Sequence, residues 1–362
     1  MIDYLNKCHF GDCLQVLQRM PDGIVNTCVT SPPYFGLRDY GHAGQIGLEP
    51  TPDEFIAKLV SVFREVRRVL RDDGTLWVNI GDSYASGGRK TPAGIKPKDL
   101  IGIPWMLAFA LRADGWYLRQ DIIWEKSNPM PESVTDRCTK SHEYIFLLSK
   151  APTYVYDHDA IKERAAPASV ARWAQDVEGQ TGSNRVPGKT NGNMKAVGGR
   201  MAGNINPPKG QAAYEAGDES HRTKGGLLAY SQRQRSARDS FKRTDSKRAE
   251  AIPGQSVGTH REDREESDWP LDERNKRSVW TVSTKPYKGA HFATFPTDLI
   301  EPCILAGAPA GGVVLDPFGG SGTTAQVAQS LGRKWILCEL NEAYRPLIED
   351  RTVQPSLDLE AA

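Results

Sequence analysis

The sequence contains little cysteine and no apolar run long enough to span a bilayer. Its six cysteines are scattered and form no Cys-x-x-Cys pair, which argues against both structural zinc and a disulfide framework. No two histidines stand at a spacing suited to a metal ion, so we expect no metal. The first residues lack the basic-then-apolar order of a secretion signal. Together these absences favour an intracellular protein with a hydrophobic core.

The chain also lacks an excess of charge of one sign. It has 46 Lys and Arg against 45 Asp and Glu in 362 residues, and a net charge of +1 neither favours nor excludes a nucleic acid partner. The basic residues are instead concentrated, because residues 161–280 hold 22 Lys and Arg against 16 Asp and Glu, with few aliphatic side chains. This segment is either a polar insertion without a partner or an element that holds phosphate groups. The candidates for phosphate contact are Arg233, Arg235, Lys242 and Arg243.

Alternating strands and helices are predicted on both sides of this polar segment. Before it, β-branched and apolar runs predict strands over 24–29, 75–80, 117–124 and 144–148, and helices over 51–70 and 103–112. After it come a strand at 313–315, a helix at 323–331, a strand at 335–340 and a closing helix from 341. This order predicts an α/β fold with a doubly wound, mostly parallel sheet, whose ligand-binding loops follow the carboxyl ends of the strands.

The strand at 24–29 runs directly into Thr30-Ser31-Pro32-Pro33-Tyr34. Proline fixes φ and has no N–H, so the carbonyls of Ser31 and Pro32 are kept out of a helix and are free to accept hydrogen bonds. A hydroxyl stands before the prolines and an aromatic ring follows them. The motif is suited to hold a planar ring that bears an amino group, and a simple Pro-Pro turn at a strand exit is the alternative.

The second motif is a glycine loop that opens a helix, Asp316-Pro317-Phe318-Gly319-Gly320-Ser321-Gly322-Thr323-Thr324. Such a loop brings backbone N–H groups and the positive end of a helix to a carboxylate or phosphate. No Lys follows the last glycine, which excludes a Walker loop, whereas a dinucleotide loop with Glu339 as the ribose ligand also fits. A dinucleotide fold starting here would need several strands after residue 340. We therefore expect the rest of the sheet to come from upstream.

In this order, the two motifs resemble those of the amino DNA methyltransferases that use S-adenosylmethionine. The amine motif precedes the cofactor loop, which is similar to the permuted group called beta, and Ser31 gives the SPPY type. Further similar segments are 11–12, 81–83, 128–133, 142–150 and 295–296. The resemblance implies a circularly permuted, Rossmann-like methyltransferase sheet. Its catalytic domain would consist of residues 1–160 and 280–362, with an inserted target-recognition region at 161–279.

The resemblance implies roles for the residues around a base flipped out of DNA. The Ser31 hydroxyl and the Pro32 carbonyl would accept hydrogen bonds from the target amine and draw its nitrogen toward sp³ geometry. Tyr34 would stack on the base, and Pro33 would pack beside it. The methyl group would then pass in line from the sulfonium, and the methylated nitrogen would lose its proton to water.

The resemblance also implies the residues that bind S-adenosylmethionine. Those in the glycine loop are Asp316, Phe318, Gly319, Gly320, Ser321, Gly322, Thr323 and Thr324, with Ser321 and the two threonines near the methionine carboxylate. The others are Asp12 for the adenine amine, Glu339 for the ribose, and Phe295 with Pro296 for the methionine side. Two alternatives remain, since the threonines could serve only to cap the helix and Asp12 could be an isolated acid.

Duplex DNA is the expected partner, and further predicted DNA contacts are Arg38, Asn128, Ser133, Arg137 and Lys140. A cognate restriction endonuclease would be a genetic rather than a physical partner. The expected location is the cytoplasm, in a setting of bacterial or phage type.

The target base depends on the residue before the Pro-Pro pair. Ser31 favours cytosine N4, because similar enzymes that act on adenine N6 mostly carry Asp or Asn there; adenine N6 is the alternative. Other classes left open are a NAD-dependent dehydrogenase, a DNA-binding protein without catalysis, and an RNA or protein-glutamine methyltransferase. A covalent cysteine intermediate is not favoured, since Pro302-Cys303 lies in an apolar, helix-like run.

Overall fold

The computed structural model describes residues 4–37, 39, 41–42, 44–85, 95–173, 273–284 and 295–353. Its backbone contacts divide the chain into two compact units, one of Met1–Glu163 with Asn275–Ala362 and one of Arg164–Arg274. In the second unit, the structure describes α4 (Pro167–Trp173). The short strands β6 (Glu163–Arg164) and β7 (Glu273–Arg274) pair with each other. The role of residues 161–279 in target recognition stays a prediction.

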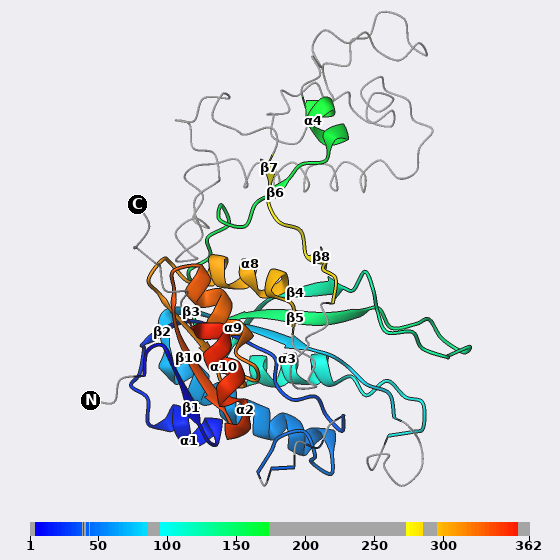
Figure 1. Cartoon of the computed structure of the whole chain (residues 1–362). Helices are drawn as coiled ribbons and strands as arrows, with labels where there is room; N and C mark the ends of the chain where they lie inside the picture. The colour runs from blue at the N-terminus through cyan, green and yellow to red at the C-terminus, as the bar shows by residue number, and fades with distance from the viewer. Residues whose placement is uncertain are drawn as a thin grey trace, which may run out of the picture. The chain divides into compact units, whose positions relative to one another are not determined.

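An eight-stranded sheet forms the centre of the first unit (Figure 1). In spatial order its strands are β1 (Lys7–Phe10), β10 (Lys334–Glu339), β9 (Val313–Asp316), β2 (Val25–Thr30), β3 (Leu70–Ile80), β5 (His142–Ser149), β4 (Tyr117–Glu125) and β8 (Val279–Thr281). Only β5 runs antiparallel to its neighbours. A loop rather than a crossover helix joins β4 to β5, and two adjacent strands joined in this way run in opposite directions. The predicted mostly parallel, doubly wound sheet is confirmed.

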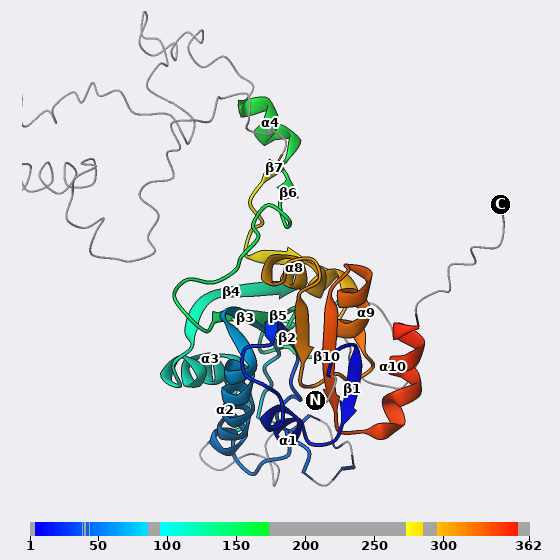
Figure 2. The same ribbon diagram turned by 90° about the vertical axis from the view of Figure 1, so that its left-hand side faces the viewer.

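Helices cover both faces of this sheet (Figures 1 and 2). On one face lie α1 (Cys13–Gln18), α2 (Pro52–Val69) and α3 (Ile103–Ala113), and on the other lie α8 (Thr297–Gly307), α9 (Thr323–Ser330) and α10 (Arg345–Thr352). Successive strand residues point to opposite faces, so Leu315 packs in the first core and Val314 in the second. No described helix is long and apolar enough to cross a membrane.

Helix α2 shows how the sequence pattern produces these layers. Its apolar residues recur every three or four positions, and Phe55, Leu59, Phe63 and Val66 are fully buried. Thr51 caps the helix by accepting a hydrogen bond from the backbone N–H of Glu54, and a proline occupies the first turn. The helix predicted over 51–70 is confirmed.

The strands that carry the two motifs, β2 and β9, are neighbours in the sheet. They run parallel, with Thr27 opposite Val314 and Cys28 opposite Leu315. Parallel neighbours end at the same edge, so the residues after Thr30 and after Asp316 emerge side by side. This places the amine motif next to the glycine loop although the two are far apart along the chain.

Candidate active site

Asp316 joins the carboxyl ends of β2 and β9 to the start of α9. Its carboxylate is fully buried and accepts hydrogen bonds from Thr30 Oγ1 at 2.6 Å, Thr324 Oγ1 at 2.6 Å and the backbone N–H of Phe318 at 3.0 Å. Burial raises the pKa of this carboxyl group, and the three donors act against that rise. Asp316 therefore lies beneath the glycine loop and fixes its geometry, and its predicted contact with the cofactor stays a prediction.

The glycine loop continues from Asp316 to the start of α9 and contacts the end of β10. The backbone N–H of Gly320 donates to Glu339 Oε2 at 2.7 Å. Gly322 begins α9 at a φ of 87°, where a side chain would be strained, and no side chain caps the helix. Ser321 is buried, and its hydroxyl has no hydrogen-bond partner in the described structure. The loop thus presents a helix N-terminus and an unpaired hydroxyl, both suited to a carboxylate ligand.

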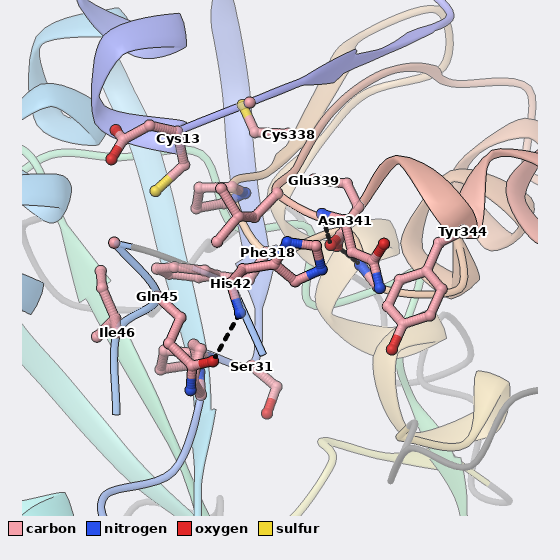
Figure 3. A pocket seen from close by; sticks show the side chains of 18 of the residues that line it. Cys13, Ser31, His42, Gln45, Ile46, Phe318, Cys338, Glu339, Asn341 and Tyr344 are labelled. Carbon is pink, nitrogen blue, oxygen red and sulfur yellow. Dashed lines mark hydrogen bonds between the residues drawn. The ribbon is translucent and has the colours of Figure 1, made fainter. Parts of the chain in front are cut away.

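A cavity of about 210 Å³ opens where the two motifs meet. Of the residues predicted for the site, nine line it: Asp12, Ser31, Pro32, Pro33, Tyr34, Phe318, Gly320, Ser321 and Glu339. In Figure 3, Ser31 lies at one end and Cys13 and Cys338 at the other, with Phe318 between them. The cavity therefore brings the amine motif and the cofactor loop onto one continuous surface.

The other predicted cofactor residues are not among those that line this cavity. Thr323 accepts a hydrogen bond from Arg351, and Thr324 bonds to Asp316. Phe295 packs against the hydrophobic core, and Pro296 is buried at the start of α8. The other three are Asp316, which lies beneath the loop, and Gly319 and Gly322, which are buried in the loop backbone. Direct cofactor contact by these residues stays a prediction, whereas a role in shaping the loop follows from their contacts.

Two carboxylates that line the cavity hold neighbouring backbone at the same time. Glu339 accepts from the N–H groups of Gly320 at 2.7 Å and Asn341 at 2.8 Å. Burial raises the pKa of Glu339, although these two hydrogen bonds lower it. Asp12 caps α1 by accepting from the N–H of Gln15 at 3.0 Å. Each carboxylate has a second lone pair per oxygen for a ligand.

Several residues that line the cavity were not predicted from the sequence. They include Cys13, Leu37, His42, Gln45, Ile46, Cys338, Asn341, Tyr344 and Leu347. Those between 36 and 47 belong to a loop that follows the amine motif and is closed by a hydrogen bond from Gly36 N–H to the Gly47 carbonyl at 2.7 Å. Its repeated glycines were a usable signal for a functional loop. Burial raises the pKa of Cys13 to about 12, so its thiol is a poor nucleophile.

Tyr34, the last residue of the amine motif, is held by two contacts outside the cavity. Its hydroxyl donates to Glu143 Oε2 at 2.6 Å. Its ring lies so close to the backbone of Gly81 that a Cβ at position 81 would come within 2.7 Å of Tyr34 Cε2. The ring orientation is therefore set by the protein rather than left free.

The predicted DNA-contact residues that the structure describes follow β4. Asn128 bonds through its side chain to the backbone of Thr284, at 2.8 Å from the Thr284 N–H and 3.1 Å to its carbonyl. Arg137 pairs with Glu132 and lies 3.9 Å from the centre of the Tyr84 ring. Lys140 donates to the backbone carbonyl of Asp82, and burial lowers its pKa. Ser133 is exposed. Three of these four side chains are thus already bonded within the protein.

The other predicted DNA contacts lie outside the described residues: Arg38, Arg233, Arg235, Lys242 and Arg243. Within the described ranges, no group of three or more His, Cys, Asp or Glu side chains is placed to hold a metal ion.

A family model described as DNA methylase, for N6 and N4 methyltransferases, matches residues 25–350. The chain is 39% identical to the Type II methyltransferase M.SmaI of Serratia marcescens, over 96% of this chain and 91% of that protein. It is 40% identical to the Type II methyltransferase M.Cfr9I of Citrobacter freundii, over 94% of this chain and 85% of that protein. The solved PvuII DNA methyltransferase (cytosine-N4-specific) has the same fold, with a TM-score of 0.55 and 16% identity over 97% of this chain and 87% of that one. The protein belongs to the N6/N4 DNA methylase family, the DNA methyltransferases that methylate amino groups with S-adenosylmethionine as donor.

Proposed function

We propose that the protein transfers a methyl group from S-adenosylmethionine to the exocyclic N4 amine of a cytosine flipped out of duplex DNA. The observation that carries the proposal is that one cavity is lined both by Ser31 to Tyr34 and by the loop residues Gly320 and Ser321. Methyl transfer requires donor and acceptor to be aligned within bonding reach, and a shared cavity supplies that alignment.

The residues present fit S-adenosylmethionine. The unpaired, buried hydroxyl of Ser321 and the uncapped N-terminus of α9 suit its carboxylate, and the free lone pairs of Glu339 suit the ribose hydroxyls. Asp12, which also lines the cavity, is a candidate acceptor for the adenine amine. When bound, S-adenosylmethionine supplies a methyl group on a positively charged sulfur.

The amine motif would act on the nitrogen that receives the methyl group. An exocyclic amine is a poor nucleophile because its lone pair is delocalised into the base. Two acceptors, the Ser31 hydroxyl and the Pro32 carbonyl, would bond its two N–H groups and draw the lone pair back to nitrogen. The ring of Tyr34 would stack on the base and hold it at the correct angle.

The choice of cytosine rests on Ser31. A neutral hydroxyl stands where similar enzymes that act on adenine mostly carry Asp or Asn, so we propose cytosine N4 as the target. We also propose that the protein works inside the cell and protects DNA against a cognate endonuclease; its similarity to Type II methyltransferases supports this role.

The test is nucleoside mass spectrometry of unmethylated DNA incubated with the protein and S-adenosylmethionine. We expect N4-methylcytosine. N6-methyladenine alone would reverse the choice of base, and the absence of any methylated nucleoside would overturn the proposed function. Sequencing of the methylated DNA would give the recognition sequence.

A Ser31→Ala variant tests the role of the hydroxyl. We expect it to keep its affinity for S-adenosylmethionine and to lose much of its turnover. The matched control is Ser61→Ala, because Ser61 lies on the exposed side of α2 and bonds only within its helix, to the Ala57 carbonyl. Turnover at the parent rate in Ser31→Ala would show that the hydroxyl does not bind the amine.

A further inference from the structure

Glu143 holds a carboxylate close to the active-site cavity but is not among the residues that line it. It lies on β5, the antiparallel strand, and its side chain is 12% exposed. Glu143 belongs to the segment 142–150, which resembles the family's sequences but has no predicted role. Its contacts show that this carboxylate is directed at Tyr34.

The carboxylate of Glu143 is surrounded by three donors from three different parts of the sheet edge. Oε2 accepts from the Tyr34 hydroxyl at 2.6 Å and from Asn79 Nδ2 at 3.2 Å, while Oε1 accepts from Lys126 Nζ at 2.5 Å. Asn79 also bonds to the Tyr144 carbonyl, which fixes its amide. Donors from β3, from after β2 and from after β4 therefore all determine where the carboxylate lies.

Burying a carboxylate to this extent costs free energy unless its charge is balanced by a nearby positive charge. Lys126, whose side chain is 21% exposed, supplies that balance and lies 4.7 Å from the centre of the Trp124 ring. Charge-assisted hydrogen bonds are shorter and stronger than neutral ones. An ion pair with fixed neighbours is thus a rigid acceptor for the Tyr34 hydroxyl.

Two contacts restrict rotation of the Tyr34 ring, one at its hydroxyl and one at its edge. Glu143 holds the hydroxyl, and the backbone of Gly81 packs against the ring. Burial, together with the charge of Glu143, raises the pKa of Tyr34 well above its usual value, so the phenol keeps the proton that it donates. The remaining surface of Tyr34 lines the cavity beside Ser31.

We propose that Glu143 is a positioning residue for methyl transfer: together with Asn79 and Lys126 it fixes the Tyr34 ring at the angle at which the ring stacks on the target base. The inference rests on the proposed function. A loosely held ring would still allow the base to enter, but it would misalign the amine with the methyl donor. Loss of Glu143 should therefore lower kcat while leaving the affinity for S-adenosylmethionine unchanged.

The test is a double-mutant cycle of Glu143→Gln and Tyr34→Phe. Glutamine keeps the size of Glu143 but loses its charge, and phenylalanine keeps the ring but loses the hydroxyl. A hydrogen bond to a charged group predicts a fall in kcat of roughly tenfold to a hundredfold for each single variant. Because Glu143 acts through the hydroxyl, the double variant should be no slower than the slower single variant. Glu65→Gln on α2, which removes a carboxylate paired with Arg68, is the matched control.

A second variant addresses the same ring without touching the ion pair. Gly81→Ala would place a methyl group 2.7 Å from Tyr34 Cε2, so the ring must shift: kcat and Tm should both fall, while S-adenosylmethionine affinity stays close to that of the parent. With 2-aminopurine at the target position, Glu143→Gln should give brighter emission than the parent, because stacking on an aromatic ring quenches a flipped base.

Three outcomes would overturn the inference. These are a parent-like kcat in Glu143→Gln, single-variant losses that multiply in the double variant, and a fall in cofactor affinity that matches the fall in turnover. Failure of the proposed function is distinct, since the parent chain itself would then methylate no DNA amine.

Discussion

Replacing Asp316 with Ala removes the carboxylate that joins β2, β9 and α9. Three hydrogen bonds are lost, and the Thr30 hydroxyl, the Thr324 hydroxyl and the Phe318 N–H are left without that acceptor. A hydrogen bond to a charged group contributes about 1.5–3 kcal/mol. The three are not additive, and removing a buried charge recovers part of its desolvation cost. We expect the free energy of unfolding to fall by about 2–4 kcal/mol.

Asp316→Asn is the conservative variant and separates charge from shape. Its amide oxygen can still accept from Thr30, and Thr324 can turn its hydroxyl to accept from the amide, so the loss should be smaller than for alanine. The two chains should also differ in how their folding stability depends on pH. Burial raises the pKa of Asp316, so between the free value of about 3.9 and the raised pKa the folded parent holds a proton that the unfolded chain has released; above that window the carboxylate is charged. The parent loses stability as pH rises through that window, and Asp316→Asn does not.

Urea unfolding and calorimetric titration with S-adenosylmethionine measure the two consequences. If Asp316 acts by shaping the loop, Asp316→Ala should lower both stability and cofactor affinity, and Asp316→Asn should lower both less. A loss of affinity with unchanged stability would mean that the carboxylate contacts the cofactor directly. Parent-like values for both would refute the structural role derived from these hydrogen bonds.

Three further predictions follow from contacts of the described residues. The affinity for S-adenosylmethionine should weaken as pH falls toward the raised pKa of Glu339, above the free value of about 4.3, and Glu339→Gln should flatten that response in a calorimetric titration. Asn128→Ala removes the bonds to Thr284, so KM for DNA should rise while cofactor affinity is unchanged; equal effects on both would contradict this. Arg68→Ala frees the carbonyls of Leu17 and Met20 and should lower the free energy of unfolding by about 1–3 kcal/mol in urea, with kcat retained.

Local patterns in the sequence were sufficient to predict most of the elements. The apolar spacing of α2 and the β-branched run of β2 are each contained in a few residues. The glycine loop and the Pro-Pro motif were also predicted as functional segments. Glycine permits backbone conformations that other residues avoid, and proline has no N–H group, so both properties follow from residue type alone. The helix at 323–331 and the strand at 335–340 were predicted to within one residue of α9 and β10.

The contacts that could not be predicted from the sequence depend on partners that are distant along the chain. Cofactor binding by Asp316 stays a prediction, and nothing near it in the sequence indicates Thr30, 286 residues away, as its hydrogen-bond partner. The same holds for Tyr34 and Glu143, which are 109 residues apart. Arg137 was taken as a DNA contact from its charge, and its pairing with Glu132 depends on how the loop after β4 folds back.

The order of the two motifs along the chain does not determine whether they form a site. Each follows a strand, and β2 and β9 need only be parallel neighbours for both loops to emerge at the same edge. β10 lies on the other side of β9, so Glu339 reaches that edge too and bonds the glycine loop from beside it. β1 in turn lies beside β10 and brings Asp12 to the same cavity from the start of the chain. The chain thus assembles one cavity because strand adjacency, rather than sequence order, determines which loops meet.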